Sequence, residues 1–333
     1  MKPTARLLVA LAAGMMLLSG LAARAGDVGF QQLTIPDGTE KPLTVGVWYP
    51  TEAAAKPERL GTVTQAVALG APMAGDHLAL VVMSHGTGSW YGQHYDTALA
   101  LAHAGFVVAA VNHTGDTYDD HSQVLQIWKR PEQIHRLIDY MLADWRGHAQ
   151  IDAGRVGVFG FSAGGFTALA AAGGTADLTL VQPHCQKVPT AFECGLTAKA
   201  SAEDAARPIP PRSAFVHDAR IKAAVVAAPA LGYTFGREGL TTLTVAVQLW
   251  RAEDDHLLPN PDYAEAVRLA LPRPPEYHVV ANADHFDFIP PCDPTLAKAA
   301  PMICATRPGF DRAAFHVEFN QAVVAFFERT LAP

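Results

Sequence analysis

The sequence lacks any run of basic residues, and charged residues of either sign are few. Of its 333 residues, 17% are charged, and the formal net charge is −7. Nucleic-acid-binding surfaces need clustered Lys and Arg side chains, so this charge balance argues against a nucleic-acid partner. There is also no internal repeat, which argues against a solenoid or a propeller. Half of the residues are hydrophobic, enough to build an ordinary globular core.

Long hydrophobic runs are absent except at the N-terminus. There, Lys2 and Arg6 precede the apolar run LLVALAAGMMLLSGLA, which ends in ARA. This order is typical of a secretory signal peptide, with cleavage after Ala25. The alternative is a membrane anchor, but the run is short for a spanning helix. We therefore expect residues 1–25 to be removed and residues 26–333 to be periplasmic or secreted, with no stable membrane span.

Cysteine is scarce, and no CxxC spacing occurs, which disfavours a zinc site. The four cysteines form two close pairs, Cys185 with Cys194 and Cys292 with Cys304. An even number in an exported protein suggests two disulfides. Three connectivities are possible, and the two local bridges are favoured over free buried thiols. Each would stabilise the fold by about 2–4 kcal/mol.

Apolar runs and helical patterns alternate along the mature chain. The runs are continuous rather than alternating, which is typical of a parallel sheet covered on both faces. Without a linker-like composition shift, the pattern predicts one domain of the α/β class, with a mostly parallel central sheet and helices on both faces. Strands are expected at 43–50, 78–86, 105–113, 155–161, 221–229, 243–250 and 276–283, and helices at 93–104, from 131, and at 163–173, 261–271 and 311–331.

Residues 176–218 do not follow this alternation of strand and helix patterns. They hold five prolines and one cysteine pair, without sustained periodicity. A long irregular insertion in a compact domain is often a lid or a binding segment. An inert surface excursion is the alternative, and the sequence leaves both open.

The stretch VGVFGFSAGGFTALAAAGG, residues 156–174, contains the motif that decides the class. A buried strand leads into Gly160-Phe161-Ser162-Ala163-Gly164 and then into a helix of small residues. This is the context of a G-x-S-x-G nucleophile elbow, in which a tight turn lifts the serine hydroxyl above the sheet. A side chain at Gly160 or Gly164 would collide with the neighbouring strand or helix. The alternative is a glycine-rich turn whose serine only caps the helix.

A serine nucleophile needs a base and an acid, which follow it in the order acid, then histidine. His285, in ADHFDF after a predicted strand, is the best candidate base. His278 and His316 lie inside element patterns and are expected to be packing or surface residues. His184 and His217 precede any suitable acid, which is the wrong order.

The acid should follow a later strand, and LTVAVQLW runs directly into RAEDDHLLP. Glu253, Asp254 and Asp255 are the candidates there. A metal site is disfavoured, because consecutive side chains point in divergent directions. His256 adjoins the acids on the same loop and is not expected to be the base.

Two backbone amides should stabilise the oxyanion of the reaction. One comes from the residue after the nucleophile, Ala163, and the other from the loop after an early strand. In VVMSHGTGSW, Gly86 allows the backbone to turn, and the amide of Thr87 is the expected donor. His85 is expected to have a structural role beside this loop.

With these residues in view, the chain resembles the α/β-hydrolase superfamily, and more closely its predicted dienelactone-hydrolase-like group, related to platelet-activating-factor acetylhydrolases. The resemblance implies a serine hydrolase of carboxylic esters that uses neither a cofactor nor a metal. It favours Asp255, because in that group the catalytic aspartate is followed by three residues and a proline, here Pro259. The stretches that carry it are SHGTGS, VNHTGDTYDD, GFSAGG, ARIKAAVVAAPALGYTF, DDHLLP, ADHFDFIPPC and PGFDRAAFHVEFNQAVVAFF.

Two positions depart from the pattern of the group. Ala252 stands where a glycine usually precedes the aspartate, and Ser162 replaces the cysteine nucleophile of true dienelactone hydrolases. The sequence therefore predicts an exported esterase with the triad Ser162, Asp255 and His285, acting on a small-molecule ester. An amidase or peptidase with the same triad, or a non-catalytic binding protein of this fold, is the alternative.

Overall fold

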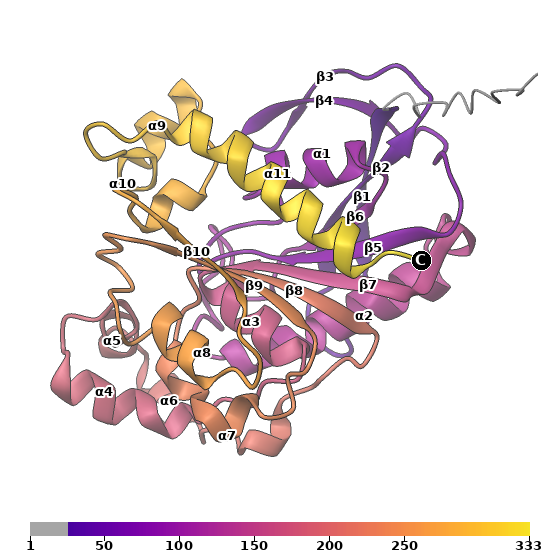
Figure 1. The fold of residues 1–333 in the computed structure, drawn as a ribbon. Helices are drawn as coiled ribbons and strands as arrows, with labels where there is room; N and C mark the ends of the chain where they lie inside the picture. Colours follow the sequence, from indigo (N-terminus) through magenta and orange to yellow (C-terminus); the bar gives the residue numbers. More distant parts are fainter. Residues whose placement is uncertain (1–25) are drawn as a thin grey trace, which may run out of the picture.

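The computed structural model describes residues 26–333 (Figure 1), so the predicted signal peptide lies outside the described residues. These residues form a 10-stranded sheet in the order β10-β9-β8-β7-β5-β6-β2-β1-β4-β3. The strands are β1 Asp27–Ile35, β2 Leu43–Thr51, β3 Lys56–Leu60, β4 Val63–Leu69, β5 Leu78–Ser84, β6 Val107–Val111, β7 Ile151–Phe161, β8 Ile221–Ala227, β9 Ala246–Ala252 and β10 Glu276–Val280.

The α-helices cover the sheet and the loops at its edge. They are α1 Tyr95–His103, α2 Arg130–Ala143, α3 Ala163–Ala171, α4 Val181–Lys187, α5 Phe192–Ala198, α6 Ala202–Ala205, α7 Gly236–Leu240, α8 Ala264–Ala270, α9 Pro294–Ala299, α10 Pro301–Cys304 and α11 Arg312–Thr330.

The six strands from β5 to β10 pair in parallel, whereas β2 runs antiparallel to β1 and β6. The predicted α/β class and mostly parallel sheet are therefore confirmed. Strands β1, β3 and β4 were not expected from the sequence. Strand β3, KPERL, is an edge strand without an apolar face, and β1 is buried in alternation over its second half, so neither gives a continuous apolar run.

Both faces of the sheet are covered, and strand β5 shows how. Its side chains alternate, with Leu80 and Val82 in one core and Val81 and Met83 in the other. The first core is completed by α2, α3 and α8, and the second by α1 and α11, which cross the opposite face (Figure 1). A strand buried on both sides is expected to be apolar at consecutive positions, as β5 is from Leu78 to Met83.

The insertion at 176–218 is more regular than expected. It contains the short helices α4, α5 and α6, of seven, seven and four residues. Helices of one or two turns are too short to display an apolar stripe, which is why the sequence shows no periodicity there. A disulfide between Cys185 and Cys194 joins α4 to α5, with the Cα atoms 5.5 Å apart.

A second disulfide joins Cys292 to Cys304, with the Cα atoms 5.7 Å apart, and closes the segment that carries α9 and α10. Both bridges are the local pairings favoured from the sequence. Among residues 26–333, none of the helices combines the length and the apolar character needed to cross a bilayer.

Candidate active site

Ser162 is the single residue between the end of β7 and the start of α3. Its backbone has φ 56° and ψ −118°, a conformation that costs a non-glycine residue of order 1–3 kcal/mol. The surroundings hold it there: the Ser162 amide donates to the Ala227 carbonyl at 2.9 Å, and its carbonyl accepts from the amides of Ala230 at 2.9 Å and Phe166 at 3.1 Å. These hydrogen bonds connect the strained turn to β8 and to the first turn of α3.

The elbow glycines are required by close backbone approach. A Cβ at Gly160 would lie 1.9 Å from the carbonyl oxygen of Gly164, and a Cβ at Gly164 would lie 1.9 Å from that of Ser84. No side-chain movement relieves a clash with backbone. The structure therefore leaves no room for a side chain at either glycine, as the motif predicts.

A hydrogen-bonded chain joins three residues that are far apart in sequence. Ser162 Oγ lies 3.1 Å from His285 Nε2, and His285 Nδ1 lies 2.8 Å from Asp255 Oδ2. All three side chains are buried. The second carboxylate oxygen of Asp255 accepts from the amides of Leu257 at 3.0 Å and Leu258 at 2.6 Å, which fixes its orientation.

The other acids of the 253–255 cluster have separate partners. Asp254 is partly exposed and pairs with Arg307 at 3.3 Å. Glu253 accepts from the amide of Asn282 at 3.1 Å. Consecutive side chains thus diverge, and within residues 26–333 no group of three or more His, Cys, Asp and Glu side chains could hold a metal ion. Of the three acids, Asp255 is the one that contacts His285.

His256 is exposed and turns away from the triad. Its amide and its Nδ1 lie 2.9 Å and 3.1 Å from the carboxylate oxygens of Asp284. Asp284 also accepts from the amide of His285 at 2.7 Å and caps the short 3₁₀ helix His285–Phe288. The neighbours of both triad members therefore tie the two loops together.

The C-terminal helix α11 contacts the loop that carries His285. Arg312 Nε donates to Asp287 Oδ1 at 3.0 Å, and His316 Nε2 lies 3.0 Å from the Asp287 carbonyl. Arg312 Nη1 also donates to the carbonyl of Ile303 at 3.0 Å, beside the second disulfide. Sequence reasoning assigned no role to Asp287 or Arg312, although both lie in stretches that carry the family resemblance.

Three other histidines considered from the sequence lie against structural neighbours. His278 stacks on Trp250, with the ring centroids 3.9 Å apart. His316 is buried, and its Nδ1 lies 2.7 Å from Asp96 Oδ2. His184 lies in the insertion, 3.6 Å from Glu193. None of these three side chains contacts Ser162.

Thr87 and Ala163, the two residues expected to supply oxyanion amides, line one cavity. Within residues 26–333, the amides of Thr87 and Ala163 have no acceptor. The amide on either side of Thr87 is occupied: Gly86 donates to Gln93 Oε1 and Gly88 to Asp116 Oδ1, both at 2.7 Å. Side chains therefore accept from the amides on both sides of Thr87, whereas the Thr87 N–H has no acceptor among the described residues.

A buried arginine, Arg130, donates hydrogen bonds to residues around the loop that carries Thr87. Arg130 donates to the carbonyl of His85 at 2.7 Å and to Asp116 Oδ2 at 2.6 Å. His85 Nε2 accepts from the amide of His113 at 3.1 Å, so Nδ1 carries the proton that bonds the Gly86 carbonyl at 2.6 Å. Burial, together with the charge of Arg130, lowers the pKa of His85 well below its usual value. His85 is therefore a neutral structural residue, in the role expected from the sequence.

Thr87 and Ala163 lie in the wall of a cavity of about 370 Å³. Most of its other lining side chains are apolar. The insertion contributes much of that lining, through Val181, Phe192 and Leu196. Residues 176–218 therefore line the same cavity as Thr87 and Ala163.

Comparison with known proteins shows likeness in structure only. No protein-family model matches the chain, and no curated protein matches its sequence. A ferulic acid esterase from Streptomyces cinnamoneus superposes with a TM-score of 0.62 at 19% identity, over 93% of this chain and 91% of that one. A dienelactone hydrolase-like promiscuous phosphotriesterase from metagenomic libraries superposes with a TM-score of 0.55 at 16% identity, over 92% and 99%. The likeness agrees with the resemblance to the dienelactone-hydrolase-like group, and this chain has the α/β-hydrolase fold.

Proposed function

We propose that the mature protein is an exported serine esterase that hydrolyses carboxylic esters through an acyl-enzyme. The observation that carries the proposal is the chain of hydrogen bonds from Ser162 through His285 to Asp255, with the serine on a strained elbow. It is supported by the amides of Thr87 and Ala163, which have no acceptor among residues 26–333. This arrangement contains a nucleophile, a base, an orienting acid and an oxyanion site, the parts needed for acyl transfer.

In the first half-reaction, Ser162 Oγ attacks the ester carbonyl carbon while His285 Nε2 takes the hydroxyl proton. The carbonyl oxygen becomes an oxyanion and accepts hydrogen bonds from the amides of Thr87 and Ala163. When the intermediate collapses, the bond to the alcohol oxygen breaks. His285 then returns its proton to that oxygen, and the alcohol leaves.

In the second half-reaction, water takes the place of the alcohol. His285 Nε2 removes a proton from the water, whose oxygen attacks the acyl carbon bound to Ser162. Collapse of the second intermediate breaks the bond to Oγ, which regains a proton from His285, and the carboxylic acid is released. Atoms and protons balance without a cofactor.

Asp255 acts on His285 rather than on the substrate. Its Oδ2 accepts the Nδ1 proton at 2.8 Å, so Nε2 presents a lone pair to the serine. In the transition state the imidazole becomes positively charged, and the buried carboxylate stabilises that charge. The amides of Leu257 and Leu258 keep the carboxylate aligned.

The structural neighbours support an ester as the substrate. One is named a ferulic acid esterase and the other a dienelactone hydrolase-like phosphotriesterase, so both names describe cleavage at an ester-type bond. A small-molecule ester is consistent with the size of the cavity beside Ser162.

Hydrolysis of p-nitrophenyl acetate by purified residues 26–333 tests the proposal. We expect Ser162→Ala to lower the rate about 10⁴-fold or more, since the nucleophile is lost. Ser201→Ala, at an exposed serine of the insertion, is the matched control and should not change it. Equal rates for wild type and Ser162→Ala would refute the esterase. Faster turnover of matched amides would instead indicate an amidase.

Export is a separate part of the proposal. The N-terminal pattern of residues 1–25 and the two disulfides support it. N-terminal sequencing of protein recovered from the periplasm or the medium should begin at Gly26. An intact Met1 in membrane-bound protein would indicate an anchor.

A further inference from the structure

The cavity beside Ser162 is large for an acetyl group. Its volume of about 370 Å³ lies in the range of pockets that hold drug-sized organic molecules, roughly 300–1,000 Å³. We refer to it as the apolar chamber. It is lined mainly by side chains of the 124–128 loop and the insertion, among them Leu125, Trp128, Val181, Phe192 and Leu196.

The insertion side of the chamber is fixed in two ways at neighbouring positions. The disulfide Cys185–Cys194 ties α4 to α5. Next to it, the buried carboxylate of Glu193 accepts from Tyr233 Oη at 2.9 Å and from Tyr263 Oη at 3.0 Å. Burial and the Glu193 charge raise the pKa of both tyrosines, so the hydroxyls remain donors. The insertion is thereby anchored to the body of the domain.

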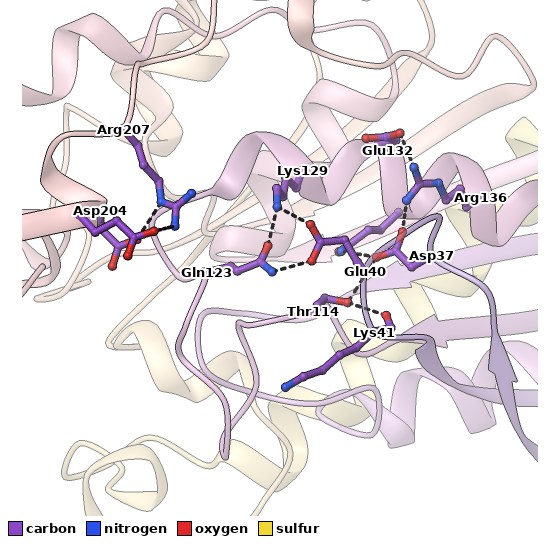
Figure 2. A network of polar contacts seen from close by, with 12 residues as sticks. Asp37, Glu40, Lys41, Thr114, Gln123, Lys129, Glu132, Arg136, Asp204 and Arg207 are labelled. Carbon is purple, nitrogen blue, oxygen red and sulfur yellow. Dashed lines mark hydrogen bonds and ion pairs between the residues drawn. The ribbon is translucent and has the colours of Figure 1, made fainter. Parts of the chain in front are cut away.

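The opposite wall is held by a surface network (Figure 2). Glu40 accepts from Lys129 Nζ at 2.8 Å and from Gln123 Nε2 at 3.0 Å, and Lys129 also donates to Gln123 Oε1 at 2.9 Å. Gln123 and Lys129 flank the 124–128 loop, whose side chains face the chamber. Across from them in the same view, Arg207 donates to Asp204 at 3.0 Å, and both residues line the chamber. Polar contacts thus connect residues of both walls to their neighbours.

The position of the chamber relative to His285 decides which part of an ester it would hold. Thr87 and Ala163 line the chamber, whereas none of the residues 283–292, which carry His285 and the turn after it, does. The alcohol oxygen must lie near His285 Nε2, which protonates it. The acid part, which stays on Ser162 after the alcohol leaves, is therefore the part directed into the chamber.

We propose that the preferred substrates are carboxylic esters whose acid part is a large apolar group, aromatic or of medium chain length, rather than acetate. The inference rests on the proposed esterase function and adds the substrate class. Each methylene placed in an apolar pocket changes kcat/KM by about 10–200-fold, so filling the chamber should dominate the specificity.

Two series of esters test the substrate class. The first keeps p-nitrophenol and varies the acid through acetate, butyrate, hexanoate and benzoate. The second keeps acetate and varies the alcohol. We expect kcat/KM for hexanoate or benzoate to exceed that for acetate by about tenfold or more, with a weaker response to the alcohol. Preference for acetate, or a stronger response to the alcohol series, would overturn the inference.

Two tryptophan substitutions test whether the apolar chamber causes the preference for large acid parts. Leu196→Trp fills the chamber and should lower the ratio of hexanoate to acetate rates about tenfold. Leu180→Trp, at an exposed leucine of the same insertion, is the matched control and should leave the ratio unchanged. An unchanged ratio in Leu196→Trp would overturn the inference. Hydrolysis that survives Ser162→Ala would refute the esterase itself, whatever the ratios.

Discussion

Arg312 on the closing helix forms a buried ion pair with Asp287, two residues after the candidate base His285. Two guanidinium nitrogens, Nε and Nη2, lie 3.0 and 2.9 Å from Asp287 Oδ1. The other carboxylate oxygen accepts from the amide of Asp284 at 2.8 Å, the residue that caps the turn of His285. The pair connects α11 to the loop that presents the imidazole to Ser162.

Breaking this pair should affect stability and catalysis together. Arg312→Met leaves the Asp287 carboxylate buried without its partner, which typically costs about 3–5 kcal/mol of unfolding free energy. We also expect a lower kcat with a shifted pH profile, because the loop of His285 loses its support. Urea denaturation and pH-rate profiles measure both. Arg329→Met removes an exposed pair on the same helix and is the control, expected to change stability by less than about 0.5 kcal/mol.

The double variant Arg312→Met with Asp287→Asn separates positioning from simple destabilisation. It removes both charges, so we expect the loss of stability to be smaller than the sum of the two single losses. Additive losses combined with an unchanged pH profile would contradict a role in holding His285.

The choice between Asp255 and Asp254 is testable by single amide substitutions. Asp255→Asn should lower kcat by about 10⁴-fold, because the amide no longer selects the imidazole tautomer that accepts the serine proton. Asp254→Asn loses only a partly exposed pair with Arg307 and should keep most of the activity. The steady-state rates of the two variants decide the register, and a larger loss in Asp254→Asn would shift it by one.

Much of the fold was predictable because the parallel core is buried on both faces. Strands such as β5 are then apolar over a continuous run, here Leu78 to Met83, and the helices between them show apolar stripes, as α2 does. Edge strand β3, with the sequence KPERL, has no such constraint and was missed. The helices of the insertion were missed because each spans at most seven residues.

The candidate site was predictable where backbone geometry restricts the sequence. Gly160 and Gly164 admit no side chain, so the elbow leaves a local signature. The order of serine, acid and histidine along the chain then predicts His285 as the base. Arg312 and Asp287 left no such signal, because a buried ion pair between residues 25 positions apart has no fixed spacing in sequence.

His94 should make stability sensitive to acid. Burial lowers its pKa to about 3, while Asp96 opposes and His316 reinforces the shift. In the part of the chain that the structure describes, neither ring nitrogen has a partner, and the ring packs against Phe159 and Phe161. The unfolded chain binds this proton near pH 6.5 and the folded protein only near pH 3, so stability falls as the pH drops between these values. His94→Leu should flatten this slope in urea denaturation, whereas His77→Leu, at an exposed histidine, should not.

The disulfide of the insertion should matter more for large substrates than for small ones. Replacing Cys185 and Cys194 together by serine removes a loop closure worth about 3 kcal/mol. It also loosens one wall of the apolar chamber. We expect a lower unfolding temperature and a higher KM for p-nitrophenyl hexanoate, with a smaller change for acetate. The double variant of Cys292 and Cys304, outside the chamber lining, is the control, and an equal change of the KM ratio in both variants would contradict this role.

Site-resolved labelling with a fluorophosphonate tests the central claim most directly. The reagent phosphonylates an activated serine and leaves unactivated hydroxyls untouched. Peptide mass mapping of residues 26–333 should place a single adduct on Ser162 in the wild type, and the adduct should be strongly reduced in His285→Ala. An adduct on another residue, or no adduct on the folded wild-type protein, would contradict the assignment of Ser162 as the nucleophile.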